Sequence, residues 1–230
     1  VVANVQHLHE DPENADALFQ VASQFNLLEM VSPEVTPERG VGIYEHDRTQ
    51  GPACAIATGA GTIYRNYFAR VADRVGQTAS QQIDCLQDMG DALGNAEKRL
   101  WTMRNGYALA TADGLRDIAD QLAAADEVRR DSLRQSLRIG IQWRTQVTIG
   151  PATHTVTQAY CSALPVAYSP LPAELWADFA VLVLEAAYEA TICAAVLNTL
   201  QTGNNRVFLT LLGGGVFGNR IDWIISALDR

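Results

Sequence analysis

Basic residues are scarce in this chain. Lys and Arg number 17 against 26 Asp and Glu, which gives a formal net charge of −9. A field of that sign repels polyanions and does not concentrate them. The composition therefore predicts a protein without a nucleic-acid partner.

Patterns that bind metals or form disulfides are also missing. The four cysteines are Cys54, Cys85, Cys161 and Cys193. No two of them form a C-x-x-C pair, and the four histidines do not lie near them at the spacing of metal ligands. Scattered single cysteines are typical of buried, reduced thiols. We therefore expect no metal, no cofactor and a cytoplasmic location.

The common hydrolase motifs and membrane signals are absent as well. The sequence has no G-x-S-x-G elbow, no S-x-x-K and no H-E-x-x-H, and no basic segment followed by an apolar one opens it. Its most apolar stretch, residues 179–200, carries Glu185 and Glu189, whose charges are costly inside a bilayer. This stretch is predicted to be a core helix, and no membrane partner is expected.

The chain does have a hydrophobic fraction of 48% over 230 residues, enough for one well-filled core. Apolar runs and turn residues predict strands at 17–25, where a helix is the alternative, 106–111, 139–149 and 206–212. Helices are predicted at 52–58, 63–75, 113–137 with Asp113 as its cap, 173–201 and 221–228. Residues 155–164 fit either type. This alternation predicts a single α/β domain over 1–230, with a mixed or parallel sheet flanked by helices.

Two of the predicted helices carry specific expectations. Within 63–75, Tyr64 and Phe68 lie on one helical face and are predicted to point into the core. Arg65 is then a candidate to clamp a phosphate with its planar guanidinium, although an arginine on a helix surface is common. Cys54, one turn into the helix 52–58, is either a nucleophile activated by the helix dipole or an inert buried thiol.

A glycine-rich loop follows the last predicted strand. Gly213, Gly215 and Gly218 satisfy G-x-G-x-x-G between a strand and a helix, the setting of a dinucleotide-binding fingerprint. Only 12 residues follow Gly218, too few for the second strand and its acidic, ribose-binding residue. No Lys-Ser or Lys-Thr follows, which excludes a nucleoside-triphosphate P-loop. The loop still suits a phosphate or diphosphate, because glycines let backbone N–H groups approach an anion; a turn needed only for close packing is the alternative.

The C-terminal third of the chain resembles a known family. The strand 206–212, the loop Leu212-Gly213-Gly214-Gly215-Val216-Phe217-Gly218-Asn219 and the last helix are similar to those of the macro domain, the ADP-ribose-binding α/β/α module. The run 16–26, which ends in Asn26, is similar to a buried strand of that family. The resemblance implies a three-layer α/β/α macro-like domain with a central mixed sheet, in which residues 76–150 are a helical insertion.

The same resemblance implies a ligand and the residues that bind it. ADP-ribose or a related NAD-derived nucleotide would be the partner, as a small molecule or on an ADP-ribosylated protein. Its diphosphate would be wrapped by Gly214, Gly215, Val216, Phe217 and Gly218, and Gly213 and Asn219 would also belong to the ligand-binding residues. Phe217 and Asn26 would face the distal ribose. The family's glycine triplet after the asparagine is absent, and Thr49-Gln50-Gly51 is the expected replacement, because a helix that opens there presents N–H groups to an anion.

A polar segment precedes that helix. The segment holds a cluster of the kind that activates water by general base action, although a solvated loop looks the same; its members are Glu45, His46, Asp47, Thr49 and Gln50. Asp47 or Glu45 is the expected base for hydrolysis of an ADP-ribosyl linkage. Glu29, three residues after Asn26, is another carboxylate that can orient a ribose hydroxyl. The alternative function is a reader or nucleotide-sensing module without catalysis.

Overall fold

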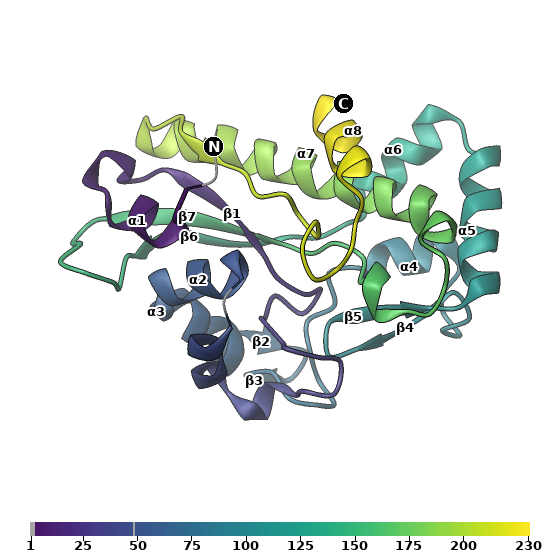
Figure 1. Ribbon diagram of the computed structural model, residues 1–230, viewed down its shortest axis with the longest axis horizontal. Helices are drawn as coiled ribbons and strands as arrows, with labels where there is room; N and C mark the ends of the chain where they lie inside the picture. The colour runs from purple at the N-terminus through teal and green to yellow at the C-terminus, as the bar shows by residue number, and fades with distance from the viewer. Residues whose placement is uncertain (1–2, 48) are drawn as a thin grey trace.

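A mixed four-stranded sheet forms the centre of the molecule. The computed structural model describes residues 3–47 and 49–230 (Figure 1). The strand order is β6-β7-β1-β8, and the strands are β1 Leu18–Ala22, β6 Gly140–Gln146, β7 Thr155–Cys161 and β8 Val207–Phe208. β1 is parallel to both β7 and β8, whereas β6 is antiparallel to β7. This mixed sheet with flanking helices confirms the predicted α/β class.

Helices cover both faces of the sheet (Figure 1). The long helix α7 (Ala177–Thr202) crosses one face, where Leu18 packs with Ala194 and Ala195. The other face carries α1 (Val5–Glu10), α2 (Gln50–Ala57) and α3 (Gly59–Ile63). Phe19, the neighbour of Leu18, packs on this side, because successive side chains of a strand point to opposite faces. β1 is buried on both faces and is therefore apolar apart from Gln20.

The remaining elements lie beside this three-layer arrangement. Two hairpins pair β2 (Arg70–Val71) with β3 (Arg74–Val75) and β4 (Trp101–Arg104) with β5 (Tyr107–Ala110). The helices are α4 (Gln87–Leu93), α5 (Ala112–Ala124), α6 (Glu127–Gln135) and α8 (Ile221–Asp229). Short 3-10 turns occur at Pro12–Asn14, Pro37–Arg39, Val41–His46, Val166–Tyr168 and Ala173–Trp176. α8 packs on the outer side of α7.

The segment 76–150 is not purely a helical addition. It contains α4, α5, α6 and the β4-β5 hairpin, but its end forms β6, a strand of the central sheet. Buried side chains from α4, α5 and α6 belong to the same hydrophobic cluster as Val21 of β1 and Phe179 of α7.

The long helix predicted over 113–137 is two helices. Ala125 has an extended backbone, and Asp126 caps α6 by accepting a hydrogen bond from the N–H of Arg129. The cap of α5 is Thr111, whose hydroxyl accepts from the N–H of Gly114, so Asp113 lies inside the first turn. A second capping residue within one polar stretch starts a new helix.

The last predicted strand is shorter than expected. Only Val207 and Phe208 pair with β1. The chain then runs alongside α7, where the Tyr188 hydroxyl donates to the carbonyl of Thr210 at 2.7 Å. The apolar character of residues 206–212 therefore results from their packing beside α7 as much as from strand pairing.

One helix in the described part of the chain, spanning 173–202, is long and apolar enough to cross a bilayer by length and composition. Its most apolar window has a mean hydropathy of 1.8, and 56% of that window is buried inside the fold.

Candidate functional site

The candidate site lies at the carboxyl ends of the neighbouring parallel strands β1 and β8. After β1 the chain reaches α2 on one face of the sheet, and after β8 it reaches α8, which packs on α7 over the other face (Figure 1). Two adjacent parallel strands whose connections leave toward opposite faces open a crevice at their carboxyl ends. In α/β folds this crevice is the usual place for a ligand.

The N-terminus of α2 meets the end of β1. A Cβ atom at Gly51 would lie 3.0 Å from the carbonyl oxygen of Ala22 and 2.6 Å from Oε1 of Glu29, so only glycine fits there. The first N–H groups of a helix have no acceptor within it, and the Thr49 side chain does not cap them. Gly51 thus holds the N-terminus of α2 against the end of β1 and the loop that follows it.

The glycine-rich loop on the other side has glycines of two kinds. Gly213 and Gly218 have φ values of 71° and 72°, and a Cβ at either would collide with Ala163 or Ala167. Glycine at these two positions is required for the turn and for close packing, which is the alternative to anion binding that the sequence left open. Gly215 is different, because a Cβ there would meet no atom within 4 Å. Close packing therefore does not explain Gly215, which lies in the exposed stretch Gly214-Gly215-Val216.

The crest of this loop carries backbone donors. The N–H of Gly218 donates to Gly215 and that of Asn219 donates to Gly213, each within the loop. Among the described residues, the N–H groups of Gly215, Val216 and Phe217 have no hydrogen-bond acceptor. Successive unpaired N–H groups in a turn form the concave donor set that binds anions.

Asn219 anchors the loop. Its side chain is buried, and Nδ2 donates to the carbonyl of Leu164 at 2.8 Å. The structure thus places Asn219 behind the loop and Val216, 61% exposed, at its crest.

A cluster of three aromatic rings packs beside the glycine-rich loop, and two of them, Phe217 and Tyr107, are buried. The Phe217 ring centroid lies 5.4 Å from that of Tyr107 and 5.6 Å from that of Tyr168. The Tyr107 hydroxyl donates to the carbonyl of Met30 at 2.6 Å. The three rings join the loops that follow β1, β7 and β8. Sequence reasoning named only Phe217, because nothing local marks a tyrosine on a hairpin as a neighbour of this loop.

Asn26 is fully buried and its amide is already bonded. Nδ2 donates to Oε1 of Gln82 at 2.9 Å, and Oδ1 accepts from the N–H of Leu28 at 3.1 Å. Gly106, at the tip of the β4-β5 hairpin, lies so close that a Cβ there would be 2.6 Å from Oδ1. Contact between Asn26 and a ribose stays a prediction, and it requires Gln82 to exchange its bond for one to the ligand.

Glu29 contributes a buried carboxyl beside α2. Within residues 3–47 and 49–230, its Oε1 has no hydrogen-bond partner, and its backbone N–H donates to the Tyr44 hydroxyl at 2.9 Å. Burial raises the pKa of this carboxyl well above its usual value, Arg65 opposes the shift, and Asp47 adds to it. A neutral carboxylic acid next to a helix N-terminus can donate to a phosphate oxygen or accept from a hydroxyl.

Arg65 is buried, and the expected orientation of its helix was wrong. Tyr64 and Phe68 are 51% and 58% exposed, whereas Arg65 is only 4% exposed. The reason is a π-helical turn over Tyr64–Phe68, which widens the helix and changes the face that meets the sheet. Arg65 is therefore neither a surface arginine nor, in this arrangement, exposed to a ligand.

Arg65 is held by its own contacts. The guanidinium lies 3.4 Å from the Tyr160 ring centroid, and Nε donates to the carbonyl of Leu27 at 2.9 Å. Nη1 has no partner in the described residues. The guanidinium places a positive charge beneath the loop that follows β1. This charge acts on the carboxyl of Glu29 and lowers its pKa.

A buried polar chain continues from Tyr160 under α2. The hydroxyls of Tyr160 and Thr58 donate to Oε1 of Gln158, whose Nε2 donates to Nε2 of His9 at 2.8 Å. Nδ1 of His9 donates to the carbonyl of Val5 at 2.7 Å, so the ring is neutral with its proton on Nδ1. Burial lowers the pKa of His9 to about 4.

The polar segment that precedes α2 lines a separate open hollow of about 480 Å³. Its lining residues are Ala3, Asn4, Gln6, Glu45, Asp47, Thr49, Gln50, Ala53 and Ile56. Asp47 accepts from the N–H of Thr49 at 2.8 Å, and the Glu45 side chain is 72% exposed. The structure thus brings four of the five predicted polar residues together at this hollow, all except His46, but the lining that it describes contains no residue of the loop 213–219.

Two further expectations concern reactive groups. Cys54 is 3% exposed, and burial followed by the charge of Glu29 raises the pKa of its thiol, so it is inert. Within residues 3–47 and 49–230, no group of three or more His, Cys, Asp or Glu side chains is placed to hold a metal ion.

The comparisons with known proteins add no relative. No family model matches the chain, and neither the curated proteins nor the solved structures contain a significant match.

Proposed function

We propose that the crevice at the carboxyl ends of β1 and β8 binds a nucleotide diphosphate of the ADP-ribose type. The observation that carries the proposal is the pair of backbone donor sets at this crevice. One is the start of α2 at Gln50 and Gly51, and the other is the crest Gly215-Val216-Phe217. The crest belongs to the loop that follows β8, and the start of α2 packs against the end of the parallel strand β1. Two donor sets suit two linked phosphates.

The other parts of the ligand have candidate partners of the appropriate chemistry. Tyr168, which is 36% exposed, offers an apolar ring to a ribose or a base, and the buried rings of Phe217 and Tyr107 pack behind it. Glu29 supplies a buried carboxyl that can bond a ribose hydroxyl. The chain is acidic overall, so binding of a dianion depends on these local donors and on the buried charge of Arg65.

A variant of the loop crest tests the binding proposal. Gly215→Glu adds a negative charge at a position with open space, so the fold tolerates the side chain. We expect the wild-type protein to bind ADP-ribose with a micromolar dissociation constant and the variant to bind at least about 100-fold more weakly, because like charges at a contact repel strongly. Isothermal titration calorimetry with ADP-ribose, AMP and NAD measures this.

A matched control separates the loop from net charge. Val128→Glu adds the same charge on α6, where the side chain is 78% exposed, and should bind like the wild type. Absence of binding of all three nucleotides to the wild-type protein, or equal binding by Gly215→Glu, contradicts the proposal.

Hydrolysis of an ADP-ribosyl linkage is the catalytic extension of this proposal, with Asp47 or Glu45 as the base. Asp47→Asn keeps the acceptor for the N–H of Thr49 but removes the base. For a catalytic Asp47, release of ADP-ribose from a modified peptide should fall by about 100-fold or more while ADP-ribose affinity is unchanged. Glu45→Gln serves as the parallel variant. The assay is chromatographic detection of free ADP-ribose.

A reader without catalysis is favoured by one observation. Asp47 and Glu45 line a hollow whose described lining excludes the glycine loop. If the wild-type protein binds ADP-ribose but releases none from a modified peptide, the function is recognition and the catalytic extension is wrong.

A further inference from the structure

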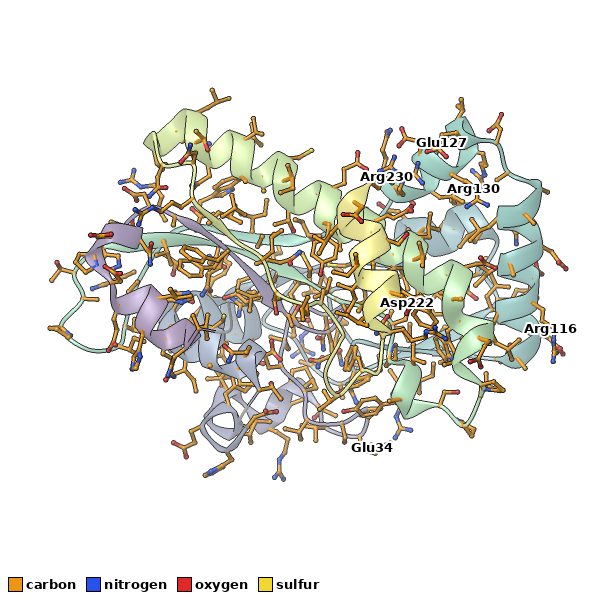
Figure 2. All side chains as sticks on the ribbon, turned by 45° about the horizontal axis from the view of Figure 1, so that its top comes forward. Glu34, Arg116, Glu127, Arg130, Asp222 and Arg230 are labelled. Atoms are coloured by element: carbon orange, nitrogen blue, oxygen red, sulfur yellow. The ribbon has the colours of Figure 1, made fainter. Side chains whose placement is uncertain are left out.

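Glu29 is the one acidic residue that the fold buries in the part of the chain that the structure describes. Charged side chains usually lie on the surface, as those of Arg116 and Glu127 do in Figure 2. Glu29 is only 9% exposed, and its Oε1 atom has no hydrogen-bond partner among the described residues. A buried polar atom without a partner costs free energy, so its presence points to a role other than folding.

The carboxyl of Glu29 is aimed at the first turn of α2. A Cβ atom at Gly51 would lie 2.6 Å from Oε1 and 2.9 Å from Oε2 of Glu29. The backbone N–H groups of Gln50 and Gly51 have no acceptor in the described part of the chain, and the next residue, Pro52, has no N–H. The carboxyl therefore lies beside two free donors of a helix N-terminus, and its Oε1 accepts from neither.

The protonation state of Glu29 decides whether this arrangement suits an anion. A carboxylate only accepts hydrogen bonds, so it would compete with a phosphate for the N–H groups of Gln50 and Gly51 and would repel its charge. A neutral carboxylic acid instead donates a hydrogen bond to a phosphate oxygen. The same geometry therefore offers a phosphate three donors when Glu29 is neutral and opposes the phosphate when Glu29 is ionised.

The groups around Glu29 favour the neutral acid. Burial is the main cause that raises the pKa of this carboxyl, the charge of Asp47 raises it further, and the guanidinium of Arg65 opposes both. Three more titratable groups interact with the carboxyl, and each is neutral because burial raises its own pKa. They are the hydroxyl of Tyr44, the thiol of Cys54 and the hydroxyl of Tyr107.

We propose that Glu29 binds the nucleotide as a neutral carboxylic acid, which donates a hydrogen bond to the phosphate at the start of α2. A phosphate is favoured over a ribose hydroxyl as its partner, because the carboxyl lies beside the free donors of α2. The inference rests on the proposed nucleotide site and deepens it by making binding depend on one proton. Loss of that proton replaces a donor by a repelling charge, so the affinity for ADP-ribose falls as the pH rises.

Calorimetric titration of ADP-ribose between about pH 6 and pH 9 tests the inference, with Glu29→Gln beside the wild type. The amide has the shape of the acid and keeps a donor and an acceptor, but it does not titrate. The phosphates of ADP-ribose lack the second ionisation, at about pH 6, of a terminal phosphate, so they do not titrate in this range either. We expect equal affinities at pH 6 and a wild type that binds at least about tenfold more weakly than the variant at pH 9.

Two further variants serve as controls. Glu97→Gln removes a carboxylate at an exposed position and should follow the wild type at every pH. Glu29→Ala removes the donor and should bind ADP-ribose at least about tenfold more weakly than Glu29→Gln at pH 6, because a hydrogen bond to a charged group is lost. Circular dichroism at each pH verifies that the variants are folded.

Failure of this inference and failure of the nucleotide site give different results. A wild-type protein that binds no ADP-ribose at any pH overturns both. If the wild type binds, the inference alone is overturned when its affinity changes with pH as that of Glu29→Gln does, or when Glu29→Ala binds as tightly as Glu29→Gln. A Glu29→Gln protein that binds at least about tenfold more weakly than the wild type at pH 6 also overturns it, because the ionised carboxylate would then be the binding form.

Discussion

Replacing Arg65 with alanine is expected to lower the free energy of unfolding by about 3 kcal/mol. The substitution removes a cation–π contact with Tyr160 and leaves the buried carbonyl of Leu27 without its donor. It also removes the positive charge that lowers the pKa of Glu29. Urea denaturation followed by circular dichroism measures the change.

An arginine in the adjacent hairpin provides the control. Arg70 is exposed at the start of β2, so Arg70→Ala should change the free energy of unfolding by less than about 0.5 kcal/mol. Arg65→Lys keeps the charge but loses the planar fork, and should fall between the two. An Arg65→Ala protein as stable as Arg70→Ala would show that the buried guanidinium contributes no net stability.

His9 is expected to make the fold sensitive to acid. Its pKa is 6.5 in an unfolded chain and about 4 in the fold. Between these values the unfolded state binds a proton that the folded state does not, so stability is lost as the pH falls from 6.5 toward 4. The shift corresponds to about 3 kcal/mol. Protonation also removes the acceptor that Nε2 offers to Gln158.

A comparison of variants isolates this effect. His9→Gln can still accept from Gln158 but does not titrate, so its stability should fall by about 3 kcal/mol less than that of the wild type between pH 7 and pH 4. His7→Gln, at an exposed position, should follow the wild type. Glu29 acts in the opposite direction, because its raised pKa weakens the fold as the pH rises above 4.5, and it contributes equally to all three proteins. Parallel pH profiles for wild type and His9→Gln would contradict the assignment.

Much of the fold was predictable because it depends on local patterns. The run Leu18–Ala22 is apolar apart from Gln20, and Gly203 ends α7 in the left-handed conformation that favours glycine. The segment 155–164 could not be assigned from its pattern. It became a strand because β1 and β6 pair with it on both sides, and that pairing is information from outside the segment.

The candidate site was less predictable because its key side chains are defined by partners far along the chain. Arg65 is buried by Tyr160 and Leu27, and Asn26 is bonded by Gln82. A helical wheel for residues 63–75 places the aromatic side chains inside, since hydrophobicity is the only local criterion. In the structure the aromatic side chains point outward and Arg65 points inward, because of the π-helical turn and the contacts that Arg65 makes with Tyr160 and Leu27. Neither feature can be recognised from the local sequence.

The hairpin β4-β5 limits how far this chain can be shortened. Its tip places Gly106 against Asn26, and the next residue, Tyr107, bonds Met30 and packs on Phe217. A segment that resembles an accessory addition therefore forms part of the structural support of the crevice. A shortened protein that lacks residues 76–139 would lose that support. The hairpin and the sheet therefore form one structural unit.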